Sequence, residues 1–246
     1  MELSEFYRLM GTIDLVEPPK HVLEELLMHR LERVRPSGSE RRRVRRAFDI
    51  SFEGHKNAPL RASGEAYIFH IVRGAFDIIE IMYEFGLRDF EWLVNFILHD
   101  VVEDAPEAGR NRFLTQTNIV LRMGYETSQE VSFLSKRTVF GKKRNNYFPE
   151  LLDCGYWRPQ GAKFIDRTDN MRTLFAMPRN SQLAKIKETE TFALPLRDAM
   201  FRNLCVIADQ GQVPFFKLHL PSILYRRLMA VVATEKNRLE HESQSL

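Results

Sequence analysis

Three short segments of this chain concentrate the kinds of side chain that bind divalent metal ions. Residues 61–70, RASGEAYIFH, end in a histidine, and residues 98–104, LHDVVED, place His99 and Asp100 before two further carboxylates. Residues 163–170, KFIDRTDN, add acidic side chains. Two imidazoles and two carboxylates from three segments form a suitable ligand set for a divalent ion. The pattern therefore favours a metal-dependent hydrolase.

The spacing within residues 98–104 indicates different roles for its acidic residues. On a helix, Glu103 lies one turn after His99, and Asp104 lies one turn after Asp100. The two later carboxylates would then stand beside a metal, where a base is needed to activate water. A solvated helix end is the alternative, although charges that directly follow an apolar run are costly unless they are paired or ligated.

The hydrophobic pattern is helical almost throughout and predicts an all-α fold. From Tyr67 to Phe85 apolar residues recur at helical spacing, Gly86 is the expected cap past that helix, and Asp89 is the expected cap of the next. Basic, turn-rich residues 138–149 predict a loop. Helices are expected over residues 21–35, 39–52 with Ser39 as cap, 67–85, 89–101, 112–135, 162–176, 182–210 and 222–240.

Bulk composition narrows the class of protein. The chain has 246 residues, 44% of them hydrophobic, which is enough for a sizeable core, and its net charge of +3 is too small for a protein that coats nucleic acid. Cys154 and Cys205 provide no disulfide framework and indicate a reducing compartment. No apolar run approaches the ~20 residues that span a bilayer, and the acidic N-terminus lacks the features of a signal peptide. We therefore expect a cytoplasmic protein without membrane or nucleic-acid partners.

In order and internal spacing, the three segments resemble the HD-domain superfamily, and specifically the hydrolase domain of the RelA/SpoT alarmone family. That family's pattern is R-x-S-G-E-P-Y-I-x-H-P, then L-L-H-D-V-V-E-D-T, then K-L-A-D-R-x-H-N-M-R-T-L. This chain has R-A-S-G-E-A-Y-I-F-H-I, I-L-H-D-V-V-E-D-A and K-F-I-D-R-T-D-N-M-R-T-L. A weaker similarity follows at residues 188–196. The resemblance covers about residues 47 to 200 and implies an all-α HD-type helical bundle with a metal at its centre.

The resemblance also implies roles for individual residues. By that similarity the metal ligands are His70, His99, Asp100 and Asp166, the residues that activate water are Glu103 and Asp104, and the nucleotide contacts are Arg61, Asn170 and Thr173. The family's metal is Mn²⁺, and this ligand set also suits Zn²⁺ or Fe²⁺. A basic loop expected near the site is a candidate phosphate clamp or a solvated loop. Its charged residues are Lys136, Arg137, Lys142, Lys143 and Arg144.

The chain departs from the family pattern at several positions. Ala66 and Ile71 replace the two prolines around the first histidine, which alters loop rigidity and leaves the ligand chemistry unchanged. Ala62 replaces a basic residue after Arg61, so one substrate contact is missing, and Asp169 replaces a histidine before Asn170. Residues 105–160 match poorly. These differences leave the base of the nucleotide substrate open.

The resemblance implies hydrolysis of the 3′-pyrophosphate of the alarmones ppGpp and pppGpp, giving GDP or GTP and pyrophosphate. We expect a helical extension over 1–46, the HD hydrolase domain over 47–213 and a C-terminal helix and tail over 214–246. No segment matches the family's synthetase half, so a small alarmone synthetase is a candidate partner, with this chain as its antitoxin. The alternatives are a phosphohydrolase of NADPH or the adenosine alarmone ppApp, and a non-catalytic nucleotide-binding regulator.

Overall fold

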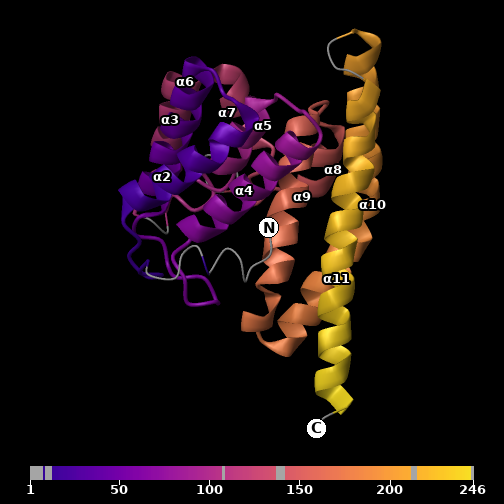
Figure 1. Ribbon diagram of the computed structural model, residues 1–246. Helices are drawn as coiled ribbons and strands as arrows, with labels where there is room; N and C mark the ends of the chain where they lie inside the picture. Colours follow the sequence, from indigo (N-terminus) through magenta and orange to yellow (C-terminus); the bar gives the residue numbers. More distant parts are fainter. Residues whose placement is uncertain (1–7, 9–12, 107–108, 137–141, 212–214, 245–246) are drawn as a thin grey trace. The chain divides into compact units, whose positions relative to one another are not determined.

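The computed structural model describes residues 8, 13–106, 109–136, 142–211 and 215–244, and these residues form helices joined by turns and loops (Figure 1). No β-strand lies within those ranges. The all-α fold expected from the hydrophobic pattern is therefore confirmed. The chain divides into two compact units, Met1–Leu151 and Leu152–Leu246. Among the described helices, none combines the length and the apolar character needed to cross a bilayer.

The helices fall into two groups along the chain. The first unit contains α2 (Lys20–Leu31), η1 (Glu32–Val34), α3 (Gly38–His55), α4 (Ile68–Glu84), α5 (Phe90–Leu98), α6 (Arg112–Met123), α7 (Tyr125–Ser132) and most of α8 (Tyr147–Asp153). The second unit contains α9 (Trp157–Arg172), η2 (Leu174–Ala176), α10 (Arg179–Asp209), η3 (Phe215–His219) and α11 (Leu220–Gln244). The domain extents predicted from the sequence, 1–46, 47–213 and 214–246, stay predictions.

The core of the first unit is built around α4, which packs against α2, α3 and α5. Most of its residues are buried because apolar side chains occur on nearly every face of the helix. Gly74 allows the close approach of α5, since a Cβ at this position would overlap the ring of Phe96. This tight pair of helices holds the start of α4 and the end of α5 in fixed positions, and the two histidines of the predicted site lie there.

Helix ends in the first unit follow local chemistry, with one correction to the sequence prediction. The helix α3 is capped by Ser37 and not by Ser39. The Ser37 hydroxyl accepts from the Glu40 amide at 3.2 Å, while the Glu40 carboxylate accepts from the Ser37 amide at 2.6 Å. This reciprocal capping box requires a glutamate three residues after the cap, which only Ser37 has. The predicted cap of α5 is confirmed, because the Asp89 carboxylate accepts from the Trp92 amide at 3.2 Å.

Two predicted helices are shorter than the sequence pattern indicates. The helix expected over 112–135 is divided at Gly124, which has a φ of 96° and ends α6 before α7 begins. Such a backbone conformation is easily adopted only by glycine. The helix expected over 89–101 ends at Leu98, and residues 99–104 form turns. The predicted site residues of this segment therefore lie on a turn that follows α5.

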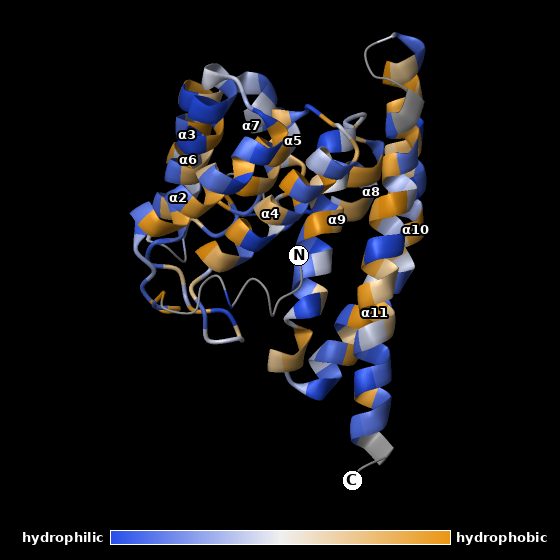
Figure 2. Ribbon diagram, viewed as in Figure 1, coloured by the Kyte–Doolittle hydropathy of each residue, from blue (hydrophilic) through white to orange (hydrophobic). Residues whose placement is uncertain are grey.

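The second unit is a set of long amphipathic helices in which α9 packs against α10 and α11. Figure 2 shows hydrophobic and hydrophilic residues alternating along α10 and α11. In α11 the buried residues Leu224, Leu228 and Val232 recur every four positions, which places them on one face. The helices predicted here are confirmed, although they begin earlier than expected. Each unit contains one of the chain's two tryptophans, buried Trp92 in α5 and buried Trp157 at the start of α9.

Candidate metal centre

Three of the four predicted metal ligands meet in the first unit. His70 lies in the first turn of α4, and His99 and Asp100 follow the last residue of α5. The His70 Nε2 and His99 Nε2 atoms are 3.4 Å apart, and His99 Nε2 is 2.7 Å from Asp100 Oδ2. Both histidines are buried, and the Asp100 side chain is 16% exposed. The three side chains thus form a compact, largely buried cluster of potential ligands.

The backbone of α5 sets which nitrogen of His99 faces this cluster. His99 Nδ1 lies 2.7 Å from the carbonyl oxygen of Phe96, and since a carbonyl oxygen can only accept, Nδ1 is the donor. In the neutral ring, the lone pair is then on Nε2, which points to His70 and Asp100. A hydrogen bond from the second ring nitrogen to a carbonyl is typical of metal-binding histidines. The Phe96 ring also stacks on His99, with centroids 4.9 Å apart.

The chemistry of these donors fits a divalent cation. A nitrogen lone pair on His99 and a carboxylate oxygen on Asp100 repel at 2.7 Å unless a proton or a cation lies between them. A cation ligated by both, and by His70, would remove that repulsion and compensate the burial of the carboxylate. Mixed imidazole and carboxylate ligands suit Mn²⁺, Fe²⁺ and Zn²⁺. The residues present therefore fit a metal site without selecting one ion.

Two residues that the sequence motifs did not single out lie directly behind this cluster. The Tyr67 hydroxyl donates a hydrogen bond to Asp100 Oδ2. The His55 ring, at the end of α3, stacks on Tyr67 with centroids 4.6 Å apart, and its Nδ1 is 3.9 Å from Asp104 Oδ2. Tyr67 lies within the first motif, three residues before His70, so its position in the sequence could have indicated a role in the site. The sequence around His55 contains no such indication, because its contacts arise only when the end of α3 packs against residues 61–67.

Burial determines the charge of both residues. Burial lowers the pKa of His55 to about 3, and the charge of Asp100 only partly opposes this, so the ring is neutral near pH 7. Burial also raises the pKa of Tyr67 well above its ordinary value, and the negative charges of Asp100 and Asp104 act in the same direction. Tyr67 therefore keeps its proton and remains a hydrogen-bond donor to Asp100.

The predicted water-activating residues lie on the turn after α5 and are held by its surroundings. The Asp104 amide donates to the Asp100 carbonyl at 2.9 Å, which closes the turn. The Glu103 carboxylate accepts from the Lys136 amide at 2.8 Å, and the Arg112 guanidinium donates to the Glu103 carbonyl at 3.0 Å. The sequence prediction placed both carboxylates on a helix, and the structure corrects this, because α5 ends before them.

Arg61 lies in a tight turn beside the cluster. Its amide donates to the Glu65 carbonyl at 2.9 Å, and its guanidinium lies over the Tyr67 ring, 5.6 Å from the centroid. Glu65 is bound by both terminal nitrogens of Arg73 at 2.7 Å, and both side chains of this pair are 2% exposed. The buried pair anchors the turn to α4 and so fixes the position of Arg61 relative to Tyr67.

The basic loop is described only in part. Lys142 and Lys143 are exposed, whereas the Arg144 guanidinium lies 3.4 Å from the Glu150 carboxylate. The Arg144 amide donates to the Lys136 carbonyl at 2.9 Å, which joins the two ends of the loop. Arg137 falls outside the described residues. The loop thus presents two exposed lysines, and its first described residue is bonded through the backbone to Glu103.

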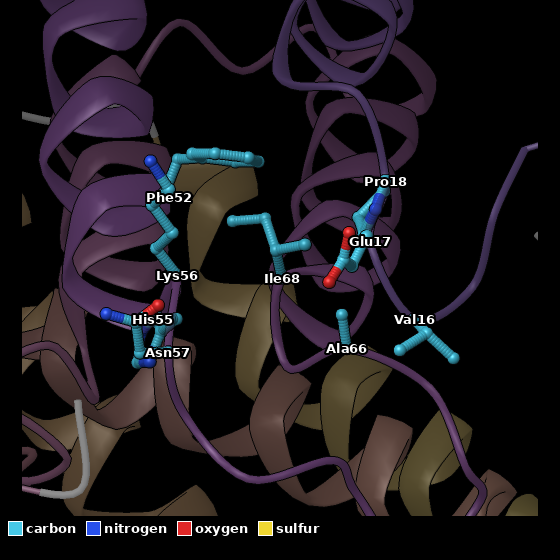
Figure 3. A pocket seen from close by; sticks show the side chains of 9 residues that line it. All are labelled: Val16, Glu17, Pro18, Phe52, His55, Lys56, Asn57, Ala66 and Ile68. Atoms are coloured by element: carbon cyan, nitrogen blue, oxygen red, sulfur yellow. The ribbon is translucent and has the colours of Figure 1, made fainter.

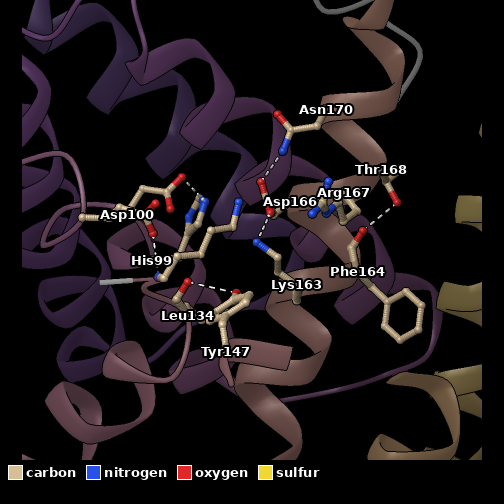
Figure 4. A network of polar contacts seen from close by, with 12 residues as sticks. His99, Asp100, Leu134, Tyr147, Lys163, Phe164, Asp166, Arg167, Thr168 and Asn170 are labelled. Carbon is tan, nitrogen blue, oxygen red and sulfur yellow. Dashed lines mark hydrogen bonds and ion pairs between the residues drawn. The ribbon is translucent and has the colours of Figure 1, made fainter. Parts of the chain in front are cut away.

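The remaining predicted residues lie on α9 in the second unit. Asp166 accepts from the Asn170 side-chain amide at 2.5 Å and lies 2.6 Å from Lys163 Nζ (Figure 4). Thr173 follows the last residue of α9, and its hydroxyl donates to the Asp169 carbonyl at 3.2 Å. The intervals between Asp166, Asn170 and Thr173 are close to one helical turn, so all three lie on one face of α9 and its end.

A cavity of about 260 Å³ lies in the first unit, beside the end of α3 (Figure 3). Apolar side chains such as Phe52 and Ile68 form much of its wall, with Glu17, Lys56 and His55 among its polar lining residues. The predicted ligands and water-activating residues are not among its lining residues. His55 thus both lines this cavity and lies 3.9 Å from the carboxylate of Asp104.

The chain is similar in sequence to proteins named as enzymes of (p)ppGpp metabolism. No protein-family model matches the chain. It is 31% identical over 163 residues to the putative GTP diphosphokinase RSH1 of the rice chloroplast, with 62% of the chain and 17% of the relative covered. It is 28% identical over 158 residues to the bifunctional (p)ppGpp synthase/hydrolase SpoT of Escherichia coli, with 63% and 21% covered.

A third relative is named as a hydrolase alone. The chain is 26% identical over 191 residues to the guanosine-3′,5′-bis(diphosphate) 3′-pyrophosphohydrolase of Aquifex aeolicus, with 76% of the chain and 24% of the relative covered. The chain thus spans about a fifth of the length of the curated relatives that it matches. The match of these relatives and the three motifs agree: the chain is a homologue of the RelA/SpoT-type (p)ppGpp hydrolases and synthetases.

Proposed function

We propose that this chain is a metal-dependent hydrolase that removes the 3′-pyrophosphate of ppGpp and pppGpp, giving GDP or GTP and pyrophosphate. The observation that carries the proposal is the cluster of His70, His99 and Asp100, in which the Phe96 carbonyl turns the His99 lone pair inward. Relatives of the chain include a protein named as a pyrophosphohydrolase of this nucleotide. We favour hydrolysis over synthesis because the matched motifs supply metal ligands and bases.

The proposed ligand set is His70, His99, Asp100 and Asp166, and the fourth member rests on the sequence motif. When bound, a divalent metal lowers the pKa of a coordinated water and polarises a phosphoryl oxygen. Mn²⁺ is the ion we propose, with Zn²⁺ and Fe²⁺ as alternatives. Lys163 lies 2.6 Å from Asp166 and would share this carboxylate with the metal or release it on metal binding.

The chain's own residues then handle the proton and the substrate. We assign proton acceptance from the attacking water to Glu103 and Asp104, which follow the ligands Asp100 and His99 on the same turn. Basic side chains neutralise the phosphates as the pyrophosphoryl group passes to the attacking water and the ribose 3′-oxygen leaves. We assign this role to Lys136, Lys142, Lys143 and Arg144, and assign nucleotide contacts to Arg61, Asn170 and Thr173.

Arg61 leaves the identity of the base open. A guanidinium stacks on any purine, and Ala62 removes a basic side chain that the family carries beside it. Hydrolysis of the adenosine alarmone ppApp, or removal of phosphate from NADPH, is therefore the second candidate, and a nucleotide-binding regulator without activity is the third. We further propose a cytoplasmic enzyme that acts as the antitoxin of a small alarmone synthetase.

A release assay over a nucleotide panel tests the proposal. The chain is incubated with ppGpp, pppGpp, ppApp or NADPH, each with Mn²⁺, with Zn²⁺ or with a chelator, and the products are separated by ion chromatography. We expect pyrophosphate and GDP from ppGpp with Mn²⁺ and no release with chelator. Orthophosphate from NADPH at rates well above any pyrophosphate release would overturn the alarmone assignment, and no release from any nucleotide would overturn the assignment as an enzyme.

A further inference from the structure

Beside the cluster of potential metal ligands lies a stacked pair of side chains that the proposed chemistry does not use. The Tyr67 hydroxyl donates a hydrogen bond to Asp100 Oδ2, and the ring of His55 lies against the ring of Tyr67 at an interplanar angle of 21°. Tyr67 also meets His70 edge to face, with centroids 5.5 Å apart. The pair therefore touches two of the three ligands of the first unit from the side of α3.

His55 is unusual because it is buried with unsatisfied nitrogens. Its side chain is fully buried, and neither ring nitrogen has a hydrogen-bond partner among the described residues. Leaving a buried polar group unbonded is costly. Its Nδ1 is 3.9 Å from Asp104 Oδ2, about 1 Å beyond hydrogen-bond length. A movement of the Asp104 carboxylate by about 1 Å would bring Nδ1 within hydrogen-bond length.

We propose that Tyr67 and His55 are positioning residues of the site: Tyr67 orients the carboxylate of Asp100 for the metal, and His55 orients the carboxylate of Asp104 for the attacking water. The inference rests on the proposed function and deepens it. A hydrogen bond to one carboxylate oxygen restricts rotation of the group, so the ligand is already oriented before the metal binds. The stacking of the two rings couples their positions. The carboxylates of Asp100 and Asp104 are therefore oriented by one rigid pair of side chains.

The competing explanation is packing alone. In that case the Tyr67 ring and the His55 ring would only fill space under α4, and removal of a polar atom would change stability without changing the site. The two explanations differ in their predictions for the hydroxyl and for the ring nitrogen. Variants that keep the shape and remove one polar atom therefore separate them.

For Tyr67 the test is metal affinity in the Tyr67→Phe variant. The variant keeps the ring and its contact with His55 and loses only the hydroxyl. Dissociation constants for Mn²⁺ and Co²⁺ are measured by competition with a chelator, and the visible spectrum of the Co²⁺-loaded protein is recorded. We expect affinity to weaken ~10- to 100-fold, as is typical when an outer partner of a ligand is lost, and the Co²⁺ spectrum to change.

Tyr147→Phe is the matched control for Tyr67→Phe. Tyr147 is also buried in the first unit, and its hydroxyl donates to the Leu134 carbonyl at 3.1 Å (Figure 4). This control also loses a hydrogen bond from a buried phenol hydroxyl, but the acceptor is a backbone carbonyl and not a proposed ligand. Metal affinity should therefore stay at the wild-type value. Equal metal affinity in Tyr67→Phe and wild type, with an unchanged Co²⁺ spectrum, would overturn the role of Tyr67.

For His55 the test is a comparison of His55→Asn with His55→Leu. The asparagine side-chain amide occupies the position of Nδ1 and keeps a donor for Asp104, whereas leucine keeps only apolar bulk. If His55 positions Asp104, the turnover rate follows the order wild type, Asn, Leu. Packing alone predicts the reverse order for stability and activity, because leucine suits a buried site better than asparagine. That reverse order would overturn the role of His55.

The wild-type protein separates failure of this inference from failure of the proposed function. Metal binding is measured without nucleotide, so it does not depend on the substrate assignment. If wild type binds Co²⁺ and releases no pyrophosphate, the proposed reaction fails and the Tyr67 comparison still decides the positioning role. If wild type hydrolyses ppGpp and all four variants retain wild-type affinity and rate, the positioning inference fails alone.

Discussion

The histidines of the first unit show how the surroundings decide what one side chain can do. The His99 ring donates to a backbone carbonyl, and its other nitrogen turns toward two further potential ligands. The His55 ring is also buried and has no hydrogen-bond partner among the described residues, and burial lowers its pKa so that it stays neutral. His99 is therefore suited to bind a cation, whereas His55 is suited to orient a neighbouring group.

At the residue scale, the first prediction concerns the two carboxylates after the ligands. The double variant Glu103→Gln and Asp104→Asn keeps the size of both side chains and removes their capacity to accept a proton. We expect the turnover number with ppGpp and Mn²⁺ to fall ~10²- to 10⁴-fold, the typical contribution of a general base, while bound metal is retained. Near-normal turnover in this variant would mean that the water is activated elsewhere.

A second prediction at this scale concerns the pH dependence of stability. The pKa of His55 falls from 6.5 to about 3 on folding, so between these pH values the unfolded chain binds a proton that the folded chain does not. The free energy of unfolding contributed by this residue is complete above pH 6.5 and decreases as the pH falls toward 3, with a slope approaching about 1.4 kcal/mol per pH unit.

Urea unfolding between pH 7.5 and pH 4.5 checks this prediction. His55→Asn removes the titrating ring and leaves every other ionisable group in place, so the contributions of the carboxylates cancel in the comparison. We expect the wild type to lose stability more steeply than the variant as the pH falls. Parallel curves for the two proteins would contradict the lowered pKa.

At the element scale, the site depends on how closely α4 and α5 pack. His70 is in the first turn of α4, His99 follows the end of α5, and Gly74 lets the Phe96 ring lie against the α4 backbone. The Phe96 ring also stacks on His99, and the Phe96 carbonyl accepts a hydrogen bond from His99 Nδ1. The distance between the two histidines is therefore tied to the absence of a side chain at Gly74.

The prediction at this scale is that Gly74→Ala damages both stability and metal binding. The new methyl group overlaps the Phe96 ring, and overpacking of this kind typically costs about 1–3 kcal/mol of unfolding free energy. Displacement of Phe96 should also weaken Mn²⁺ affinity. Gly38→Ala is the control, because the nearest atom to its Cβ would be Arg42 Nη1 at 3.5 Å. Thermal unfolding and chelator competition on both variants check the prediction, and equal effects would contradict it.

Much of this arrangement was predictable from local patterns, and the remainder depended on packing. The apolar spacing before Gly86 and the cap at Asp89 predict the structure correctly, because both are local signals. The hydrophobic pattern predicts the end of α5 too late, because Val101 and Val102 are apolar and continue the helical pattern although the backbone has already turned. The Ser37 cap was identifiable from the glutamate three positions later, but Ser39 offered a competing hydroxyl.

Within the site, motif spacing identified the potential ligands but not the residues Tyr67 and His55 that contact them or the neighbouring carboxylate. His70, His99 and Asp100 were named from sequence, and the structure brings their ligand atoms together. The bond from Tyr67 to Asp100 and the stacking of His55 join residues far apart in the chain. The first contact depends on how α4 packs against α5, and the second on how the end of α3 meets the start of α4, and neither is predictable from a local pattern. The assigned roles of the catalytic and substrate-binding residues stay predictions.

At the scale of the whole molecule, metal binding should be visible as stabilisation of the folded chain. A ligand that binds only the folded state raises the free energy of unfolding by about 2.7 kcal/mol at a hundred times its dissociation constant. We expect the midpoint of thermal unfolding to rise when Mn²⁺ replaces chelator. His99→Ala removes a proposed ligand and should abolish both the rise and the bound metal. Stoichiometric metal in that variant would contradict the assigned site.

Each of the two units contains one buried tryptophan, so the unfolding of each unit can be followed separately. Trp92 is buried in α5 of the first unit, Trp157 is buried at the start of α9 in the second, and the chain has only these two. Intrinsic fluorescence therefore contains one signal from each unit. With Trp157→Phe the emission reports the first unit, and with Trp92→Phe it reports the second. The protein thus contains its own pair of optical probes, with which the cooperativity of the two units can be followed without an attached dye.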